Sequence, residues 1–158
     1  MGVEEFRDKL EYSSTMTDKA IAAPTASIRT RLAAMVYELL LVVAVLFITS
    51  FVFIRLTGDA QSGWHQALFQ VFLVVVLFGY FSTFWLRSGQ TLAMKTWRIK
   101  LVDHEGKLIP LKQAALRFLL AAAGLGLFGL SIFWAWFDRD RQFLHDRLAN
   151  TRLIRLAP

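Results

Sequence analysis

The chain of 158 residues contains no cysteine and only three histidines and three prolines. Without cysteine it can form neither a disulfide nor a thiolate metal site. The histidines show no HExxH or comparable ligand spacing, and no pattern of serine, histidine and acid indicates a nucleophile. The sequence therefore predicts no metal centre, no cofactor and no enzymatic activity.

Charged residues are also scarce, at 19% of the chain, whereas hydrophobic residues make up 56%. A soluble domain usually keeps its apolar fraction near about 45–50%, because it must also cover a surface. The excess here is concentrated in three blocks, at residues 32–54, 67–86 and 114–137. A helix needs about 20 apolar residues to cross a hydrocarbon core of roughly 30 Å. We therefore predict an α-helical integral membrane protein in which the first two blocks are full transmembrane helices.

Basic residues crowd the ends of these blocks and give the chain a net charge of +6. Cytoplasmic loops of membrane proteins collect Lys and Arg. The basic residues gather in a flexible N-terminal arm (1–28) and the start of the first block, in the 87–112 connection and in the tail after Phe137. All three parts are predicted to be cytoplasmic, with the 55–65 loop outside. Membrane orientation explains the net charge, so no nucleic-acid partner is expected.

The third block, 114–137, conflicts with this topology if it crosses the membrane once, because the basic tail would then lie outside. Its centre reads GLGLFG, and glycine weakens a helix by up to about 1 kcal/mol per residue relative to alanine. We favour a broken or re-entrant segment that turns near Gly124–Gly129 and is shielded by the other helices. The alternative is a simple third span in which the glycines allow close helix packing.

Between the second and third blocks, the stretch TWRIKLVDHEGKLIPL alternates apolar and polar side chains around a turn at 103–107. This period of two predicts strands, so a small cytoplasmic β-hairpin is expected over about residues 96–111. The final TRLIRL has the same character. It could pair with the hairpin only if the tail also lies inside.

Glu38 lies about two turns inside the first block, where a carboxylate is costly. Arg31 is seven residues earlier, so both lie on one helix face, about 10 Å apart along the axis. Arg31 can extend to the headgroups, and Arg87, Arg117 or Arg141 could instead be the partner of the acid. Burial penalises a charged carboxylate, so an acid without a partner would be protonated, whereas an ion-paired acid could stay ionised.

The ionisable residues near the membrane boundary form a candidate polar cluster or ion-coupling site. Its predicted members are Arg31, Glu38, Arg117, Asp138, Arg141, His145 and Asp146. Charges near hydrocarbon are tolerated chiefly when they pair or reach water, so these groups are expected to converge. The alternative is that each charge is solvated separately in the headgroup region. A salt-bridged interfacial tail explains His145 and Asp146 better than a metal site does.

Three sequence runs resemble the RDD family: RLAAMVYE from Arg31, GQTLAMK, and RQFLHDRLANT in the tail. The resemblance covers about residues 29–156, taken as a single membrane domain. Arg31 matches the family's arginine and Asp146 its later aspartate, whereas Glu38 replaces the first aspartate. The family consists of small bacterial multi-pass membrane proteins, so the resemblance implies an inner-membrane location. It also implies a largely unknown role, with cation/proton antiport proposed for some members.

Two functions are compatible with these features. In the first, the protein is a small oligomeric transporter or transporter subunit in which Glu38 exchanges a proton for a cation, since an ionisable group in a span marks an ion path by default. Two or three spans can hardly enclose a path, so self-association is expected. In the second, the protein is a non-transporting assembly or interaction module. It would then present its basic cytoplasmic face to an unrelated membrane protein or to anionic lipid of the bilayer.

Overall fold

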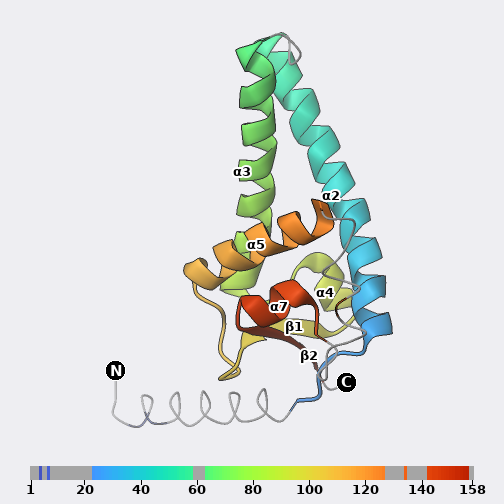
Figure 1. Ribbon diagram of the computed structural model, residues 1–158, viewed down its shortest axis with the longest axis vertical. Helices are drawn as coiled ribbons and strands as arrows, with labels where there is room; N and C mark the ends of the chain where they lie inside the picture. Colours follow the sequence, from blue (N-terminus) through green and yellow to red (C-terminus); the bar gives the residue numbers. More distant parts are fainter. Residues whose placement is uncertain are drawn as a thin grey trace.

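The computed structural model describes Glu4, Arg7, Trp134 and residues 23–58, 63–126 and 142–156. Two long helices, α2 and α3, come together at one end of the molecule and diverge toward the other end (Figure 1). Shorter elements lie at the open end: α4 (Leu92–Thr96), α5 (Leu111–Gly126), α7 (Leu144–Leu148), β1 (Ile99–Asp103) and β2 (Thr151–Arg155). We call this part the base and define it as residues 23–27, 88–126 and 142–156.

The long helices are α2 (Ile28–Thr57) and α3 (Trp64–Arg87). Ser27 caps the start of α2, where its hydroxyl oxygen accepts the backbone N–H of Thr30 at 3.2 Å. Gly58 ends α2 with a φ of 78°, a left-handed conformation that glycine adopts without steric cost. Local capping signals thus fix both ends of the first long helix.

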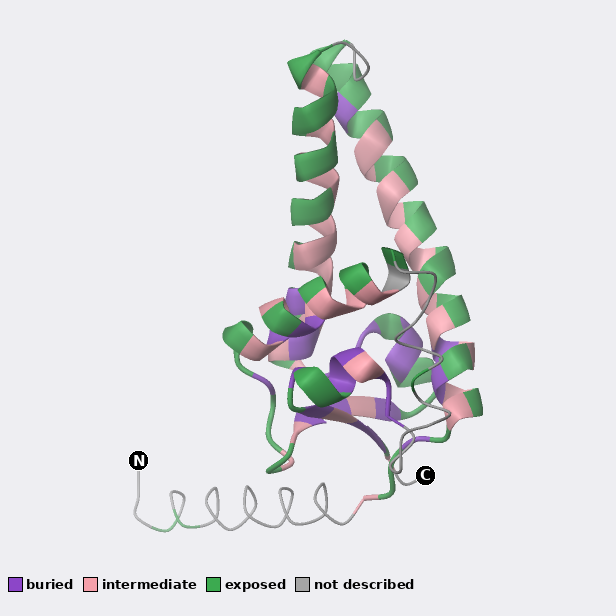
Figure 2. Cartoon of the chain, viewed as in Figure 1, coloured by how far each residue is buried: buried purple, intermediate pink, exposed green. Residues whose placement is uncertain are grey.

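Both long helices are long and apolar enough to cross a membrane. They contain 30 and 24 residues, and at about 1.5 Å per residue each exceeds a hydrocarbon core of roughly 30 Å. Only 6% of the most apolar window of either helix is buried, whereas the core helix of a soluble protein is mostly buried. Figure 2 shows exposed residues along both helices and buried residues gathered in the base. The predicted spans at 32–54 and 67–86 therefore correspond to α2 and α3.

The base contains a two-stranded antiparallel sheet. Strand β1 (Ile99–Asp103) pairs with β2 (Thr151–Arg155) along its whole length. The β-hairpin predicted over 96–111 is therefore wrong in its second arm, because the tail supplies the partner strand. The chain turns after β1 and passes through Pro110, which has no N–H to donate to a ladder and directly precedes α5.

The segment before α2 adds a short contact to the other edge of β2. Thr25 forms an isolated antiparallel bridge with Ile154, and the N–H of Ala26 donates to the carbonyl of Leu153 at 2.9 Å. These residues fall within the N-terminal arm predicted over 1–28, most of which lies outside the described residues. The tail strand is thus held between β1 and the segment that leads into α2.

Helix α5 (Leu111–Gly126) forms the first part of the third apolar block. Its 16 residues rise only about 24 Å, and the helix lies across the open end of α2 and α3 (Figure 1). Phe118 of α5 packs edge-on against Phe78 of α3, with ring centroids 5.4 Å apart. Apart from Trp134, residues 127–141 lie outside the described part. The re-entrant turn near Gly124–Gly129 therefore stays a prediction.

A hydrophobic core joins the base to the lower ends of the long helices. Its buried members are Ala26, Ala34, Trp85, Met94, Ile99, Leu101, Ile109, Ala114 and Leu153. Gly89 lets the chain pass close to this core: its φ is 69°, and an added Cβ would lie 2.6 Å from the carbonyl oxygen of Leu101. The N–H of Leu101 in turn donates to the Gly89 carbonyl at 2.8 Å. The link between α3 and α4 is therefore fixed against β1.

Candidate functional site

Two groups of polar side chains lie where the long helices meet the base. The first, which we call the ion-pair cluster, consists of Arg31, Arg117, His145 and Asp146. The second, the hydroxyl cluster, consists of Glu38, Tyr80 and Thr91. Each includes one residue of α2, but their other members come from different elements, and their chemistry differs.

The ion-pair cluster is centred on Arg117 of α5 and Asp146 of α7 (Leu144–Leu148). Their side chains form an ion pair, and they are only 6% and 0% exposed. Nη1 of Arg117 also donates to Oγ1 of Thr151 at 3.1 Å, and this hydroxyl donates to the backbone oxygen of Asp146 at 3.2 Å. The two charges neutralise each other out of contact with water.

Aromatic rings cover the guanidinium groups of the cluster. Cζ of Arg117 lies 5.2 Å from the ring centroid of Trp85. Arg31, in the first turn of α2, is only 1% exposed, and its Cζ lies 5.6 Å from the ring centroid of Phe143. A cation over an aromatic face is attracted by the ring quadrupole, so a ring helps to hold each arginine in place. Arg117 has polar contacts as well.

His145 completes this cluster as a neutral group. Its Nε2 lies 3.5 Å from Oδ1 of Asp146, and its ring stacks on Phe143 with centroids 5.6 Å apart. Burial lowers the pKa of His145 to about 2, and the nearby charges of Arg117 and Arg31 act in the same direction. Asp146 would favour the protonated imidazole, but its carboxylate is already paired with Arg117.

The hydroxyl cluster joins α2, α3 and the start of α4 (Leu92–Thr96). The phenol of Tyr80 donates to Oε1 of Glu38 at 2.9 Å, and the hydroxyl of Thr91 donates to Oε2. Thr91 also caps α4, since its Oγ1 accepts the backbone N–H of Met94 at 3.3 Å. Glu38 therefore has one hydroxyl partner on a long helix and one in the base.

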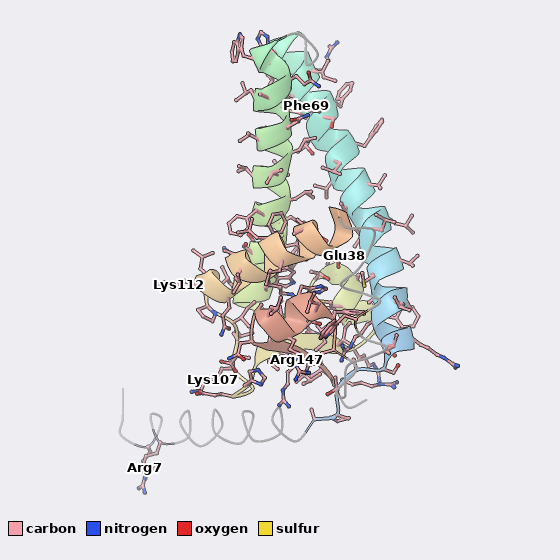
Figure 3. The ribbon with its side chains drawn as sticks, in the orientation of Figure 1. Arg7, Glu38, Phe69, Lys107, Lys112 and Arg147 are labelled. Atoms are coloured by element: carbon pink, nitrogen blue, oxygen red, sulfur yellow. The ribbon has the colours of Figure 1, made fainter. Side chains whose placement is uncertain are left out.

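Glu38 does not pair with an arginine among the described residues. None of their ion pairs includes it, although Arg31 lies two turns earlier on the same helix. Arg31 is instead buried against Phe143, while Glu38 lies on the inner side of α2, facing the other helices (Figure 3). Arg87 and Arg117 are therefore not its ion-pair partners. Pairing with Arg141 stays a prediction, because Arg141 lies outside the described residues.

The structure divides the predicted polar cluster in two. It brings together Arg31, Arg117, His145 and Asp146 and gives Glu38 separate partners, while Asp138 and Arg141 lie outside the described residues. Sequence reasoning missed Tyr80 and Thr91, which lie 42 and 53 positions from Glu38. Nothing local marks them as partners of the acid, apart from the position of Thr91 inside the GQTLAMK run.

The oxygen atoms around Glu38 come from one carboxylate and two hydroxyls. Among the described residues, no group of three or more His, Cys, Asp or Glu side chains could hold a metal ion. Such an arrangement can bind a proton, or a cation that a single negative charge suffices to balance.

Comparison with known proteins gives a family match. The sequence profile of the RDD family matches residues 25–150, which confirms the resemblance seen in the sequence. The "uncharacterized protein RP437" of Rickettsia prowazekii (strain Madrid E) is 39% identical over 83 residues, which cover 52% of this chain and 46% of that protein. This chain thus spans about half the length of that relative. No solved structure matches the chain.

Proposed function

The chain belongs to the RDD family, and we propose that it exchanges protons for a small monovalent cation at Glu38. One observation carries the proposal: the Glu38 carboxylate has two hydroxyl partners and, in the described residues, no cationic one. An ionisable residue within a membrane span marks an ion path by default. The partners of Glu38 suit a group that changes its charge during function.

Hydroxyl groups can accompany an acid through a change of protonation. A hydroxyl donates to an ionised carboxylate and can also accept a hydrogen bond from a protonated one, whereas guanidinium only donates. Tyr80 can reverse its hydrogen bond by rotating its O–H. Thr91 already accepts the Met94 N–H, and a hydroxyl oxygen has a second lone pair for the acid proton. Glu38 could therefore gain or lose a proton without losing either contact.

The same oxygen atoms suit a small hard cation. Carboxylate and hydroxyl oxygens are hard ligands of the kind that alkali and alkaline-earth ions prefer. Glu38 supplies one negative charge, and its two hydrogen-bond partners among the described residues are neutral hydroxyls. One charge balances one monovalent cation or one proton, which supports a monovalent substrate over a divalent one.

Transport by this chain requires assembly with other copies, because two long helices can hardly enclose a path. Glu38 is only half-buried within one chain, which leaves it accessible from a neighbouring subunit. Diluting the protein in lipid should therefore reduce the flux per chain. A constant flux per chain would contradict the need for assembly.

We place the base on the cytoplasmic side of a bacterial inner membrane. Its surplus of Lys and Arg supports this orientation, because cytoplasmic segments collect both residues. A reporter fused after Pro158 should be active only in the cytoplasm. Activity only outside the cytoplasm would reverse the assignment.

Reconstitution into liposomes with an internal pH-sensitive dye tests the exchange itself. Wild-type protein should move protons when Li⁺, Na⁺ or K⁺ is added on one side. Glu38→Gln keeps the side-chain shape without the charge and should abolish this flux, whereas Tyr80→Phe should only reduce it. Glu105→Gln is the matched control, because Glu105 is an exposed acid in the turn after β1. The absence of cation-dependent flux in wild type, or unchanged flux in Glu38→Gln, would refute the proposal.

The second candidate is a non-transporting assembly or interaction module for an unrelated membrane protein. The ion-pair cluster favours it, because it joins α2, α5 and α7 through buried charges that serve structure rather than exchange. If the reconstituted protein shows no cation-dependent proton flux, co-purification of one unrelated membrane protein with it in mild detergent would favour this candidate. Recovery of the protein's own copies alone would count against it.

A further inference from the structure

Three helix ends near the junction of the long helices and the base each carry a basic residue. Arg29 lies in the first turn of α2, Arg87 is the last residue of α3, and Lys112 is the second residue of α5. All three are exposed. Among the described residues, none of the three takes part in an ion pair, so their charges are available to a ligand.

The exposed face of α5 indicates where the membrane boundary lies. Lys112, Leu116 and Leu119 follow the i, i+4, i+7 spacing of one helix face, and the two leucines are 44% and 63% exposed. Arg117 and Ala114 instead point into the base and are buried. A helix that lies across the spans with exposed leucines and a lysine has the features of an interfacial helix. The lysine stem can then follow the apolar surface while its ammonium group reaches the headgroups.

The acidic residues of the base do not compensate these charges. Asp103 is the last residue of β1, and Glu105 lies in the turn that follows, where it already pairs with Lys107 at 2.7 Å. Figure 3 shows Lys107 on the side of the base away from the long helices, whereas Lys112 lies at the outer end of α5. Arg29, Arg87 and Lys112 therefore have no acidic partner among the described residues at the ends of their helices.

We propose that Arg29, Arg87 and Lys112 bind the phosphate groups of anionic phospholipids. Arginine forms paired charge-assisted hydrogen bonds with phosphate, and lysine binds it as a point charge. Each basic residue near an anionic leaflet strengthens binding by about fivefold. Zwitterionic headgroups carry a cation beside the phosphate, so the three side chains should prefer lipids with net negative charge. The proposal is independent of any exchange at Glu38.

Competition between two lipids tests this site on the full-length protein in neutral detergent. Native mass spectrometry should detect more retained phosphatidylglycerol than phosphatidylcholine of the same chain length. The triple variant R29Q/R87Q/K112Q should lose this preference by at least about tenfold, given about fivefold per residue. The triple variant R98Q/K107Q/R155Q removes the same charge from the sheet and turn, and it should change the preference by less than about threefold.

Other outcomes of the same experiment would overturn the proposal, separate a lipid phosphate from a free anion, or require a single variant if the triple variant unfolds. Equal retention of both lipids by wild type, or an equal loss in the control triple, would overturn the proposal. Displacement of the lipid by inorganic phosphate, but not by chloride at the same ionic strength, would assign a free-anion site and also overturn it. If R29Q/R87Q/K112Q unfolds, Arg87→Gln alone should still weaken the preference by about fivefold, and no change in a folded Arg87→Gln would refute the site.

Discussion

The two polar clusters place the same chemical group, a carboxylate, in two kinds of surroundings. Asp146 is fully buried and faces guanidinium, which can only donate and cannot lose its charge in practice. Glu38 is half-buried and faces two hydroxyls, which can donate or accept. The partner rather than the acid therefore decides whether a carboxylate near the membrane is fixed in one charge state or free to change it.

The two clusters also differ in the free-energy cost of replacing their acid. Burying two ions costs solvation free energy, which their attraction repays only when further contacts satisfy the remaining polar atoms. Thr151 and the ring of Trp85 supply such contacts to Arg117. Removing one ion leaves the other buried without its countercharge. A neutral substitute at Glu38 leaves no such charge behind, because its partners are hydroxyls.

The largest expected effect is the contrast between Asp146→Asn and Glu38→Gln. Asp146→Asn should lower the free energy of unfolding by about 3–5 kcal/mol, because it leaves the charge of Arg117 buried and uncompensated. Glu38→Gln should change it by less than about 1 kcal/mol, because an amide still hydrogen-bonds to hydroxyls. Thermal unfolding in detergent, followed by tryptophan fluorescence, measures both.

A double variant provides the control for this contrast. Replacing both ions in R117M/D146L should be less destabilising than Asp146→Asn alone, since an apolar pair of similar volume is often tolerated in place of a buried ion pair. If Asp146→Asn and Glu38→Gln lowered the free energy of unfolding equally, the distinction between the two clusters would be wrong.

A smaller effect should appear as a pH dependence of the ion-pair cluster. His145 has a folded pKa of about 2 against an ordinary value of 6.5, so only the unfolded chain takes up its proton between these values. Its contribution to stability is therefore complete above pH 6.5 and is lost as the pH falls. The loss should be up to about 1.4 kcal/mol per pH unit, or about 2 kcal/mol between pH 6.5 and pH 5.

His145→Gln should remove this part of the pH dependence. His104→Gln is the matched control, because His104 is exposed in the turn after β1 and should leave the dependence unchanged. The same slope of unfolding free energy against pH in wild type and His145→Gln would contradict a neutral buried imidazole.

The sequence predicted features that depend on local composition better than those that depend on pairing. Length and apolar content alone identified both long helices, because a membrane span needs an uninterrupted apolar run. The pairing of the hairpin region with the final TRLIRL was predicted only on the condition that the tail lies inside, and a local second arm was preferred as the partner of β1. Strand character does not select among partners, and the actual partner, β2, lies about 50 residues further along the chain. The sequence likewise showed that Glu38 needed a partner but could not identify Tyr80 and Thr91. Hydroxyl residues are common, and their pairing depends on how α3 and α4 are placed.

The position of β2 between β1 and the segment before α2 has a consequence for how the protein is made. Synthesis proceeds from the N-terminus at about 5–20 residues per second, so β1 waits roughly 2–10 s for the strand that it pairs with. Residues 24–26 wait longer, because both long helices are synthesised in between. Membrane insertion of the helices can therefore precede closure of the sheet. During that interval the apolar side chains of the base lack their cover and are open to chaperones and proteases.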